Sequence, residues 1–236
     1  IFWQQLKEHP NYDEFWRSRG IIQHLDNIKP AVMVVGGLFD AEDLYGPFET
    51  YETIEETSDN YNIMVFGPWS HGDWARNKKR QAVGNVYFGD DISTYYQDSI
   101  ESKFFRHFLI EGNTNKPELP EAKVFDTGLK QWNSFEQWPP KNRTSKTYYL
   151  GNNQQLSNLP NANFENTFVS DVKKPVPYSE DIKMVFTPRK YMTDDQRFAA
   201  RRPDVLVYET PVMTEDMTLV GDIMAKLKVA TTGTAS

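Results

Sequence analysis

The sequence contains no cysteine, and basic residues are in the minority. Without cysteine the chain forms no disulfide and has no thiolate for a metal site or for nucleophilic catalysis. Lys and Arg number 26 against 33 Asp and Glu, giving a formal net charge of −7. That balance argues against a nucleic-acid sleeve or a polybasic membrane anchor. No apolar run reaches the roughly 18 residues of a membrane-spanning helix, so we expect neither a membrane nor a nucleic-acid partner.

The first half of the chain reads as a strand, a helix and a second strand. Residues 31–36 and 62–67 are largely apolar runs of strand length, typical of parallel strands covered on both faces. Between them, residues 47–56 start with proline and place apolar side chains at turn spacing, which predicts a helix. Such units cross over right-handed with parallel strands, so both strands should end at one sheet edge. Residues 93–111 predict an amphipathic helix that stops at Gly112.

The composition changes after that helix. Residues 113–120 are polar and contain two prolines, which predicts a domain boundary. Short strand patterns follow at residues 122–125, 146–150, 167–169, 205–209 and 224–230, separated by connectors rich in Pro and Asn. They predict a β-sandwich or jelly roll. The expected fold class is therefore α/β plus β, with an α/β domain over residues 1–112 and an incomplete jelly-roll β-sandwich over residues 118–236.

An acid and an imidazole follow the two strands at matched positions. Asp40 is four residues past Gly36, and His71 is four residues past Gly67. Neighbouring parallel strands lie about 4.8 Å apart, and open α/β sheets gather functional groups at the carboxyl ends of their strands. We therefore expect the two side chains to meet. A carboxylate that orients a histidine general base is part of a Ser-His-Asp triad, and this order of acid and histidine is that of α/β-hydrolases.

The serine of such a triad is not identifiable in the sequence. No Gly-x-Ser occurs in the 236 residues, so the strained turn that presents the α/β-hydrolase nucleophile is not encoded. Ser70 adjoins His71 but lacks that turn. The chain begins at Ile1 rather than Met and stops just after a strand pattern. We expect it to be an internal piece of a longer protein, with the nucleophile upstream.

Three residues beside the Asp–His pair each admit two interpretations. Glu42 and Asp43 follow Asp40, so that three carboxylates come just after a parallel strand, where open α/β sheets place ligands and catalytic groups. The same acids could instead stabilise the positive end of a helix dipole. Trp69 either lines the pocket or fills the core.

Five separated stretches together resemble one family of serine hydrolases. The family includes cocaine esterase and X-Pro dipeptidyl-peptidase, and within it the chain resembles the α-amino acid ester hydrolases, often labelled glutaryl-7-aminocephalosporanic acid acylases. The resemblance covers nearly the whole chain. The stretches are, in order, GGLFDAED at 36–43, GPWSHG at 67–72, FFRHFL at 104–109, QWNSFEQWPP at 131–140 and RRPDVLVYET at 201–210.

The resemblance implies a serine hydrolase that acts by acyl transfer on α-amino acid esters or related amides, such as β-lactam side chains. It assigns Asp40 and His71 to the catalytic triad, and Glu42 and Asp43 to the cluster that receives the substrate's ammonium group. The serine and the oxyanion donors would lie upstream, so this piece alone is expected to be inactive. A small ester or amide is the expected partner, with no cofactor and no metal.

Further expectations concern organisation and location. Residues 1–26, with two short helix patterns, are expected to be the end of a helical cap on the α/β-hydrolase domain. Self-association is compatible with the resemblance, since related esterases often assemble. A periplasmic or secreted location is suggested by the likeness to amino-ester hydrolases.

Other functions remain open from the sequence. The same Asp–His pair fits a general carboxylesterase or an X-Pro dipeptidyl-peptidase-like hydrolase if Glu42 and Asp43 only start a helix. A jelly roll with exposed aromatic residues can also be a carbohydrate-binding module. Its stacking platform would consist of Trp132, Trp138, Tyr148 and Tyr149. Alternatively these residues fill the sandwich or cover the catalytic domain, which the resemblance favours.

Overall fold

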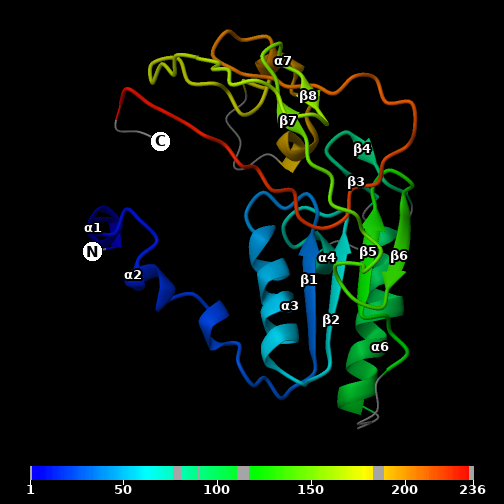
Figure 1. Cartoon of the computed structure of the whole chain (residues 1–236). Helices are drawn as coiled ribbons and strands as arrows, with labels where there is room; N and C mark the ends of the chain where they lie inside the picture. The colour runs from blue at the N-terminus through cyan, green and yellow to red at the C-terminus, as the bar shows by residue number, and fades with distance from the viewer. Residues whose placement is uncertain (1, 77–80, 90, 111–116, 183–188, 234–236) are drawn as a thin grey trace. The chain divides into compact units, whose positions relative to one another are not determined.

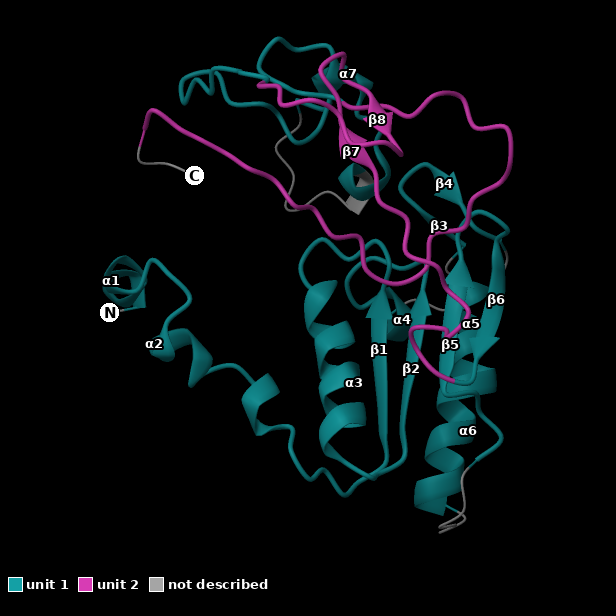
Figure 2. Cartoon of the chain, in the orientation of Figure 1, with its two compact units in different colours: residues 1–136, 166–207 teal, residues 137–165, 208–236 magenta. Residues whose placement is uncertain are grey.

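The computed structural model describes residues 2–76, 81–89, 91–110, 117–182 and 189–233 (Figure 1). The chain divides into two compact units (Figure 2). Unit 1 comprises residues 1–136 and 166–207, and unit 2 comprises residues 137–165 and 208–236. The chain therefore passes from one unit to the other three times.

Unit 1 is built on a four-stranded sheet with the order β1-β2-β5-β6. β1 (Val32–Gly37) and β2 (Asn62–Gly67) pair in parallel along their whole lengths, so that Gly37 lies opposite Gly67. α3 (Tyr45–Thr57) connects the two strands and packs against both. Figure 1 shows both arrowheads at the same edge of the sheet. The predicted strand–helix–strand unit is confirmed.

The other half of the sheet comes from a segment that was expected to begin the C-terminal sandwich. β5 (Ala122–Asp126) pairs in parallel with β2, and β6 (Gln131–Phe135) pairs with β5 in an antiparallel hairpin. The apolar side chains of β5 are buried. Burial of both faces beside β2 explains why this short strand joins the α/β sheet. The domain ranges 1–112 and 118–236 stay predictions.

The helix predicted over residues 93–111 forms, but it alternates between α- and π-helical turns. It consists of α5 (Ile92–Tyr96), η2 (Gln97–Glu101), α6 (Ser102–Phe105) and η3 (Arg106–Ile110), of which η2 and η3 are π-helical. The apolar residues at every fourth position still form one buried face of the helix. Its members Ile92, Tyr96, Ile100 and Phe104 are all buried. Gly112 and residues 113–116 of the predicted connector lie outside the described residues.

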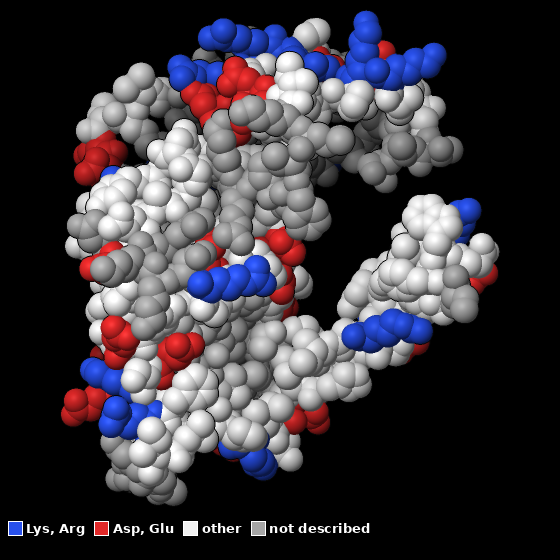
Figure 3. Space-filling model, turned by 180° about the vertical axis from the view of Figure 1, so that it is seen from behind, with Lys and Arg blue, Asp and Glu red and all other residues white. Residues whose placement is uncertain are grey.

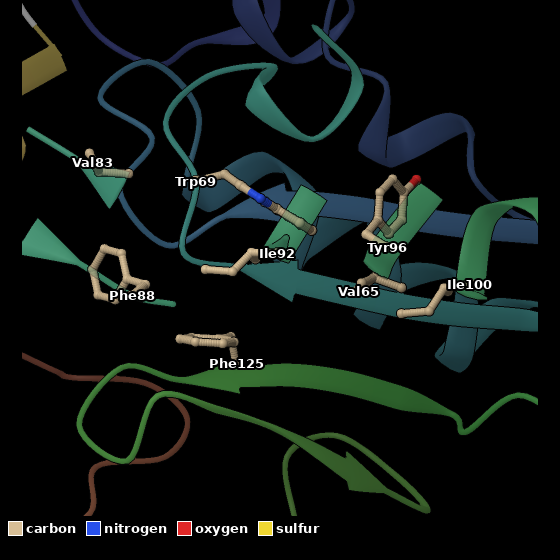
Figure 4. Close-up of a cluster of buried hydrophobic side chains, with 8 residues drawn as sticks. All are labelled: Val65, Trp69, Val83, Phe88, Ile92, Tyr96, Ile100 and Phe125. Carbon is tan, nitrogen blue, oxygen red and sulfur yellow. The ribbon is translucent and has the colours of Figure 1, made fainter. Parts of the chain in front are cut away.

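The core of unit 1 lies between this helix and the sheet (Figure 4). Trp69 is fully buried at its centre, and its ring centroid lies 6.0 Å from that of Trp74, 5.3 Å from Tyr96 and 5.6 Å from Trp132. Burial of large aromatic rings supplies much of the apolar area that stabilises such a core. The buried cluster consists of Val65, Trp69, Val83, Phe88, Ile92, Tyr96, Ile100 and Phe125.

Short elements complete unit 1. α1 (Phe2–Glu8) and α2 (Glu14–Arg17) confirm the two predicted N-terminal helices, and neither contains a buried residue. Their assignment to a helical cap stays a prediction. The remaining elements are η1 (Ile22–His24), α4 (Asp73–Arg76), the hairpin of β3 (Ala82–Val83) and β4 (Val86–Tyr87), η4 (Arg189–Thr193) and α7 (Arg197–Ala200).

Unit 2 has little regular structure. β7 (Tyr149–Leu150) and β8 (Leu156–Ser157) form an antiparallel pair, and Gln155 makes an isolated parallel bridge to Glu209. The strand predicted at residues 224–230 of this unit is not formed in the described chain, and neither is the one predicted at residues 167–169, which belong to unit 1. Residues 205–209, at the boundary of the two units, contribute only the bridge at Glu209. A strand pattern forms a strand only where a neighbour satisfies its backbone groups. Leu227 and Val229 are exposed, as an unpaired strand segment would be.

The surface carries both signs of charge. Acidic and basic side chains are both spread over the face seen in Figure 3, in keeping with the modest net charge of −7. No helix within the described residues has both the length and the apolar composition needed to cross a membrane.

Candidate active site

Backbone hydrogen bonds join the loops that leave β1 and β2. The amide of Leu38 donates to the carbonyl of Gly67 (2.9 Å), and the amide of Phe39 donates to the carbonyl of Trp69 (3.0 Å). Gly37 makes this approach possible, because a Cβ there would lie 2.4 Å from the Trp69 carbonyl oxygen. These bonds hold the loops that follow β1 and β2 beside each other at the carboxyl edge of the sheet.

This arrangement brings Asp40 and His71 together. His71 Nδ1 lies 2.9 Å from Asp40 Oδ2. The Asp40 side chain is only 2% exposed, whereas that of His71 is 41% exposed. The second carboxylate oxygen, Oδ1, accepts hydrogen bonds from the amides of Glu42 (2.8 Å) and Asp43 (3.1 Å). The predicted contact is present, with the acid buried and the imidazole open to solvent.

The surroundings of Asp40 favour its charged form. Burial by itself raises the pKa of the carboxyl, but the hydrogen bonds from Glu42, Asp43 and His71 outweigh it, so the pKa lies below its ordinary value. An ionised carboxylate can only accept hydrogen bonds. In the neutral ring, His71 Nδ1 therefore carries the hydrogen that Asp40 accepts, and Nε2 is the nitrogen with the free lone pair.

The lowered pKa predicts a pH dependence of stability. The stability that ionised Asp40 contributes is present above its ordinary pKa of 3.8 and is lost as pH falls through the lower pKa of the folded state. The difference in unfolding free energy between wild type and Asp40→Asn should therefore shrink below about pH 4, as measured by urea unfolding at several pH values. Asp59→Asn, at an exposed position, is the control. A difference independent of pH would contradict this prediction.

Glu42 and Asp43 lie in different surroundings. Asp43 Oδ1 accepts a hydrogen bond from the amide of Gly46 (2.8 Å) in the first turn of α3, where the N-cap residue Leu44 makes no side-chain bond. Asp43 therefore serves the helix start, one of the two alternatives that the sequence left open. Glu42 is 57% exposed, and its Oε2 lies 3.9 Å from His71 Nε2. Of the two acids, Glu42 adjoins the nitrogen expected to act as the base.

Two neighbours of His71 are buried. Trp69 has no exposed surface. It therefore fills the core of unit 1, and the alternative that it lines the pocket is wrong. The indole is buried because it inserts between the helix and the sheet at the centre of the aromatic cluster. Ser70 is 3% exposed, and its hydroxyl donates a hydrogen bond to Asp73 Oδ2. It is therefore not placed to act as a nucleophile.

One residue of the aromatic platform in the carbohydrate-binding alternative packs against the core of unit 1. Trp132 belongs to β6, is partly buried and contacts Trp69, Tyr95 and Phe125. The carbohydrate-binding alternative stays a prediction.

One residue of the site was missed by sequence reasoning. Asp73 is completely buried and begins α4, two residues after His71. The signal for it was present, because Ser70-x-x-Asp73 has the spacing of a capping box at a helix start.

No three His, Cys, Asp or Glu residues of the described ranges are grouped so that they could hold a metal ion.

Two protein-family models match the chain. Residues 1–73 match the X-Pro dipeptidyl-peptidase (S15 family) model, and residues 114–236 match the X-Pro dipeptidyl-peptidase C-terminal non-catalytic domain. The second match covers more than half of the chain. The sequence is also 26% identical to the cocaine esterase of Rhodococcus sp. (strain MB1 Bresler) over 240 residues, covering 96% of this chain and 40% of that protein.

Two solved structures are similar to the chain in fold and sequence. An aminopeptidase from a marine sediment Thaumarchaeota archaeon matches with a TM-score of 0.78 and 29% identity, over 88% of this chain and 35% of its own. An α-amino acid ester hydrolase matches with a TM-score of 0.76 and 29% identity, over 91% and 37%. The chain thus spans 40% or less of each of these relatives. The chain belongs to the serine hydrolase family that includes X-Pro dipeptidyl-peptidase, cocaine esterase and α-amino acid ester hydrolase.

Proposed function

We propose that this chain supplies the histidine and the acid of a Ser-His-Asp triad in a hydrolase that cleaves α-amino acid esters or related amides. The observation that carries the proposal is the imidazole of His71, held at Nδ1 by the buried Asp40 and flanked at Nε2 by the carboxylate of Glu42. The serine and the oxyanion donors are proposed to lie in a part of the protein outside these 236 residues.

Each residue has a defined part in the proposed reaction. His71 Nε2 takes the proton of the serine hydroxyl as the oxygen attacks the substrate carbonyl, and it then gives that proton to the leaving alcohol or amine. Asp40 holds the ring in the correct tautomer and stabilises the imidazolium. Water, activated by the same nitrogen, releases the acyl group from the serine. No cofactor is needed for these steps.

Glu42 is proposed to give the site its preference for a free amine. A carboxylate 3.9 Å from Nε2 lies close to the scissile bond, where the α-ammonium group of an amino acid ester also lies. An ammonium group would gain charge-assisted hydrogen bonds that a neutral analogue lacks. In support, two relatives are named as an aminopeptidase and an α-amino acid ester hydrolase. Asp43 is proposed to act mainly through α3, since its carboxylate already caps that helix.

A pair of esters tests this proposal in a longer protein that includes the chain. Phenylglycine methyl ester has a free α-amine, and phenylacetic acid methyl ester lacks it. We expect a higher kcat/KM for the first ester, and we expect Glu42→Gln to reduce that preference about tenfold, the equivalent of one charge-assisted hydrogen bond.

Asp43→Asn is the matched control, because the amide oxygen can still accept from Gly46 and only the charge is lost. It should leave the preference within about threefold of wild type, since a neutral acceptor still caps the helix. Equal rates on the two esters in the wild-type protein would contradict the amine preference and favour a general carboxylesterase, as the likeness to cocaine esterase allows. Release of dipeptides from X-Pro peptides would instead favour the peptidase activity.

The C-terminal part is proposed to contribute to a jelly-roll β-sandwich without catalytic groups. Its support is the match of residues 114–236 to a domain described as non-catalytic, together with the antiparallel β7–β8 pair. The pattern at residues 224–230 alternates apolar side chains with lysines, as a half-buried strand would. Protection of these amides from hydrogen exchange in the longer protein would support the sandwich, and rapid exchange would contradict it.

A further inference from the structure

The described residues contain two buried carboxylates, and the proposed mechanism uses only one of them. Asp40 is 4% exposed and Asp73 is 0% exposed. A charged group is costly to bury unless hydrogen bonds compensate its lost hydration. The bonds that Asp73 makes therefore indicate what it stabilises.

Those bonds close a small ring of backbone around His71. Both the amide (3.3 Å) and the hydroxyl of Ser70 donate to Asp73 Oδ2. In return, the amide of Asp73 donates to the carbonyl of Ser70 (3.1 Å). Ser70 and Asp73 flank His71 and Gly72, so three hydrogen bonds hold the two ends of the segment that presents the imidazole.

The ring is anchored to the body of unit 1. The Ser93 hydroxyl, itself fully buried, donates to the carbonyl of Asp73 (3.5 Å), and the Gln97 side-chain amide donates to the carbonyl of Trp74 (2.6 Å). Gly72 completes the tight path with a φ of +71°, a conformation that favours glycine. The backbone of His71 is thus tied to the long helix as well as to β2.

The imidazole itself has fewer constraints. Its side chain is 41% exposed, and Nδ1 is held by Asp40, which belongs to a different loop. That hydrogen bond has the right length only while the backbone of the His71 loop stays in place. Displacement of a catalytic group by about 1 Å can cost about 100-fold in rate.

We propose that Asp73 is a positioning residue: through Ser70 it fixes the backbone of His71 so that Nδ1 meets Asp40 and Nε2 faces the substrate. This inference rests on the proposed hydrolase function. It assigns to Asp73 an effect on kcat rather than on substrate binding, because Asp73 is buried and does not reach the solvent-exposed side of the ring.

The test uses Asp73→Ala, Ser70→Ala and the double variant in the longer protein that includes this chain. Asp73→Ala removes the acceptor of both Ser70 bonds, and Ser70→Ala removes the hydroxyl bond alone. We expect each single variant to lower kcat about 10- to 100-fold with KM changed less than about threefold. The double variant should be no slower than Asp73→Ala, since Ser70→Ala removes a bond that is already lost there. Asp59→Ala should leave kcat unchanged, and Ser70→Ala still tests the inference if Asp73→Ala does not fold.

A spectroscopic measurement separates positioning from stability alone. The Nδ1 proton of His71, hydrogen-bonded to Asp40, should give a downfield proton NMR signal that is lost in His71→Ala. We expect the signal to broaden or disappear in folded Asp73→Ala and Ser70→Ala, and to persist in Asp59→Ala. An unchanged signal and unchanged kcat in folded variants would overturn the inference. If the wild-type protein hydrolyses no ester or peptide, the proposed function fails, while the NMR signal still decides whether Asp73 positions His71.

Discussion

Asp40→Asn should lower kcat about 10⁴-fold in a longer, active protein that includes this chain, with little change in KM. The asparagine can still accept the amides of Glu42 and Asp43 with its oxygen. It then presents an NH₂ group to His71 Nδ1, where Asp40 now accepts a hydrogen bond. The ring would adopt the other tautomer, with the proton on Nε2, and could no longer act as a base.

His71→Ala should cost at least as much, because it removes the base itself. Steady-state kinetics on an amino acid ester measure both variants, with Asp59→Asn as the exposed-carboxylate control. Circular dichroism confirms that each variant is folded. A loss of less than about tenfold for folded Asp40→Asn would contradict the assignment of Asp40 as the triad acid.

Trp69→Ala should have the largest effect on stability, about 3 to 5 kcal/mol in the free energy of unfolding. The indole has no exposed surface and contacts three other aromatic rings, so its removal leaves a cavity that the rigid sheet cannot close. The loss should also loosen the loops that contain Asp40 and His71, because the carbonyl of Trp69 accepts a hydrogen bond from the amide of Phe39.

Trp3→Ala is the matched control, since Trp3 is 68% exposed and lies in a helix without buried residues. It should change the unfolding free energy by less than about 0.5 kcal/mol. Denaturant unfolding followed by circular dichroism measures both variants, and Trp69→Phe should lie between them. Equal effects of Trp69→Ala and Trp3→Ala would show that the aromatic cluster does not stabilise the fold.

Much of unit 1 was predictable because its signals are local. Apolar runs at residues 31–36 and 62–67 and a helix between them require two parallel strands with one carboxyl edge, and the structure has them. Asp40 and His71 follow from this, because each lies four residues past a strand-end glycine. The π-helical turns within residues 92–110 were not predictable, since an apolar residue every fourth position fits either helix type.

The partners of short strands were not predictable. Nothing in residues 122–125 says that they pair with β2 rather than with a later strand, since that choice depends on which neighbour buries Val124 and Phe125. The same reason applies to residues 224–230, whose alternating pattern is not matched by a strand in the described chain. Long-range pairing is a property of the whole sheet, so single-strand patterns do not contain it.

The sequence by itself determined the strand–helix–strand unit, the approach of Asp40 and His71 and, through its motifs, the hydrolase family. Tertiary structure decided which side chains are free to act. Glu42 and Asp43 are adjacent acids, yet a hydrogen bond to Gly46 commits one to a helix while the other adjoins Nε2. Trp69 and Asp73 are both completely buried, because burial depends on segments that are distant in the chain. The sequence determines which chemical groups are present, and the packing of distant segments determines which of them a substrate can reach.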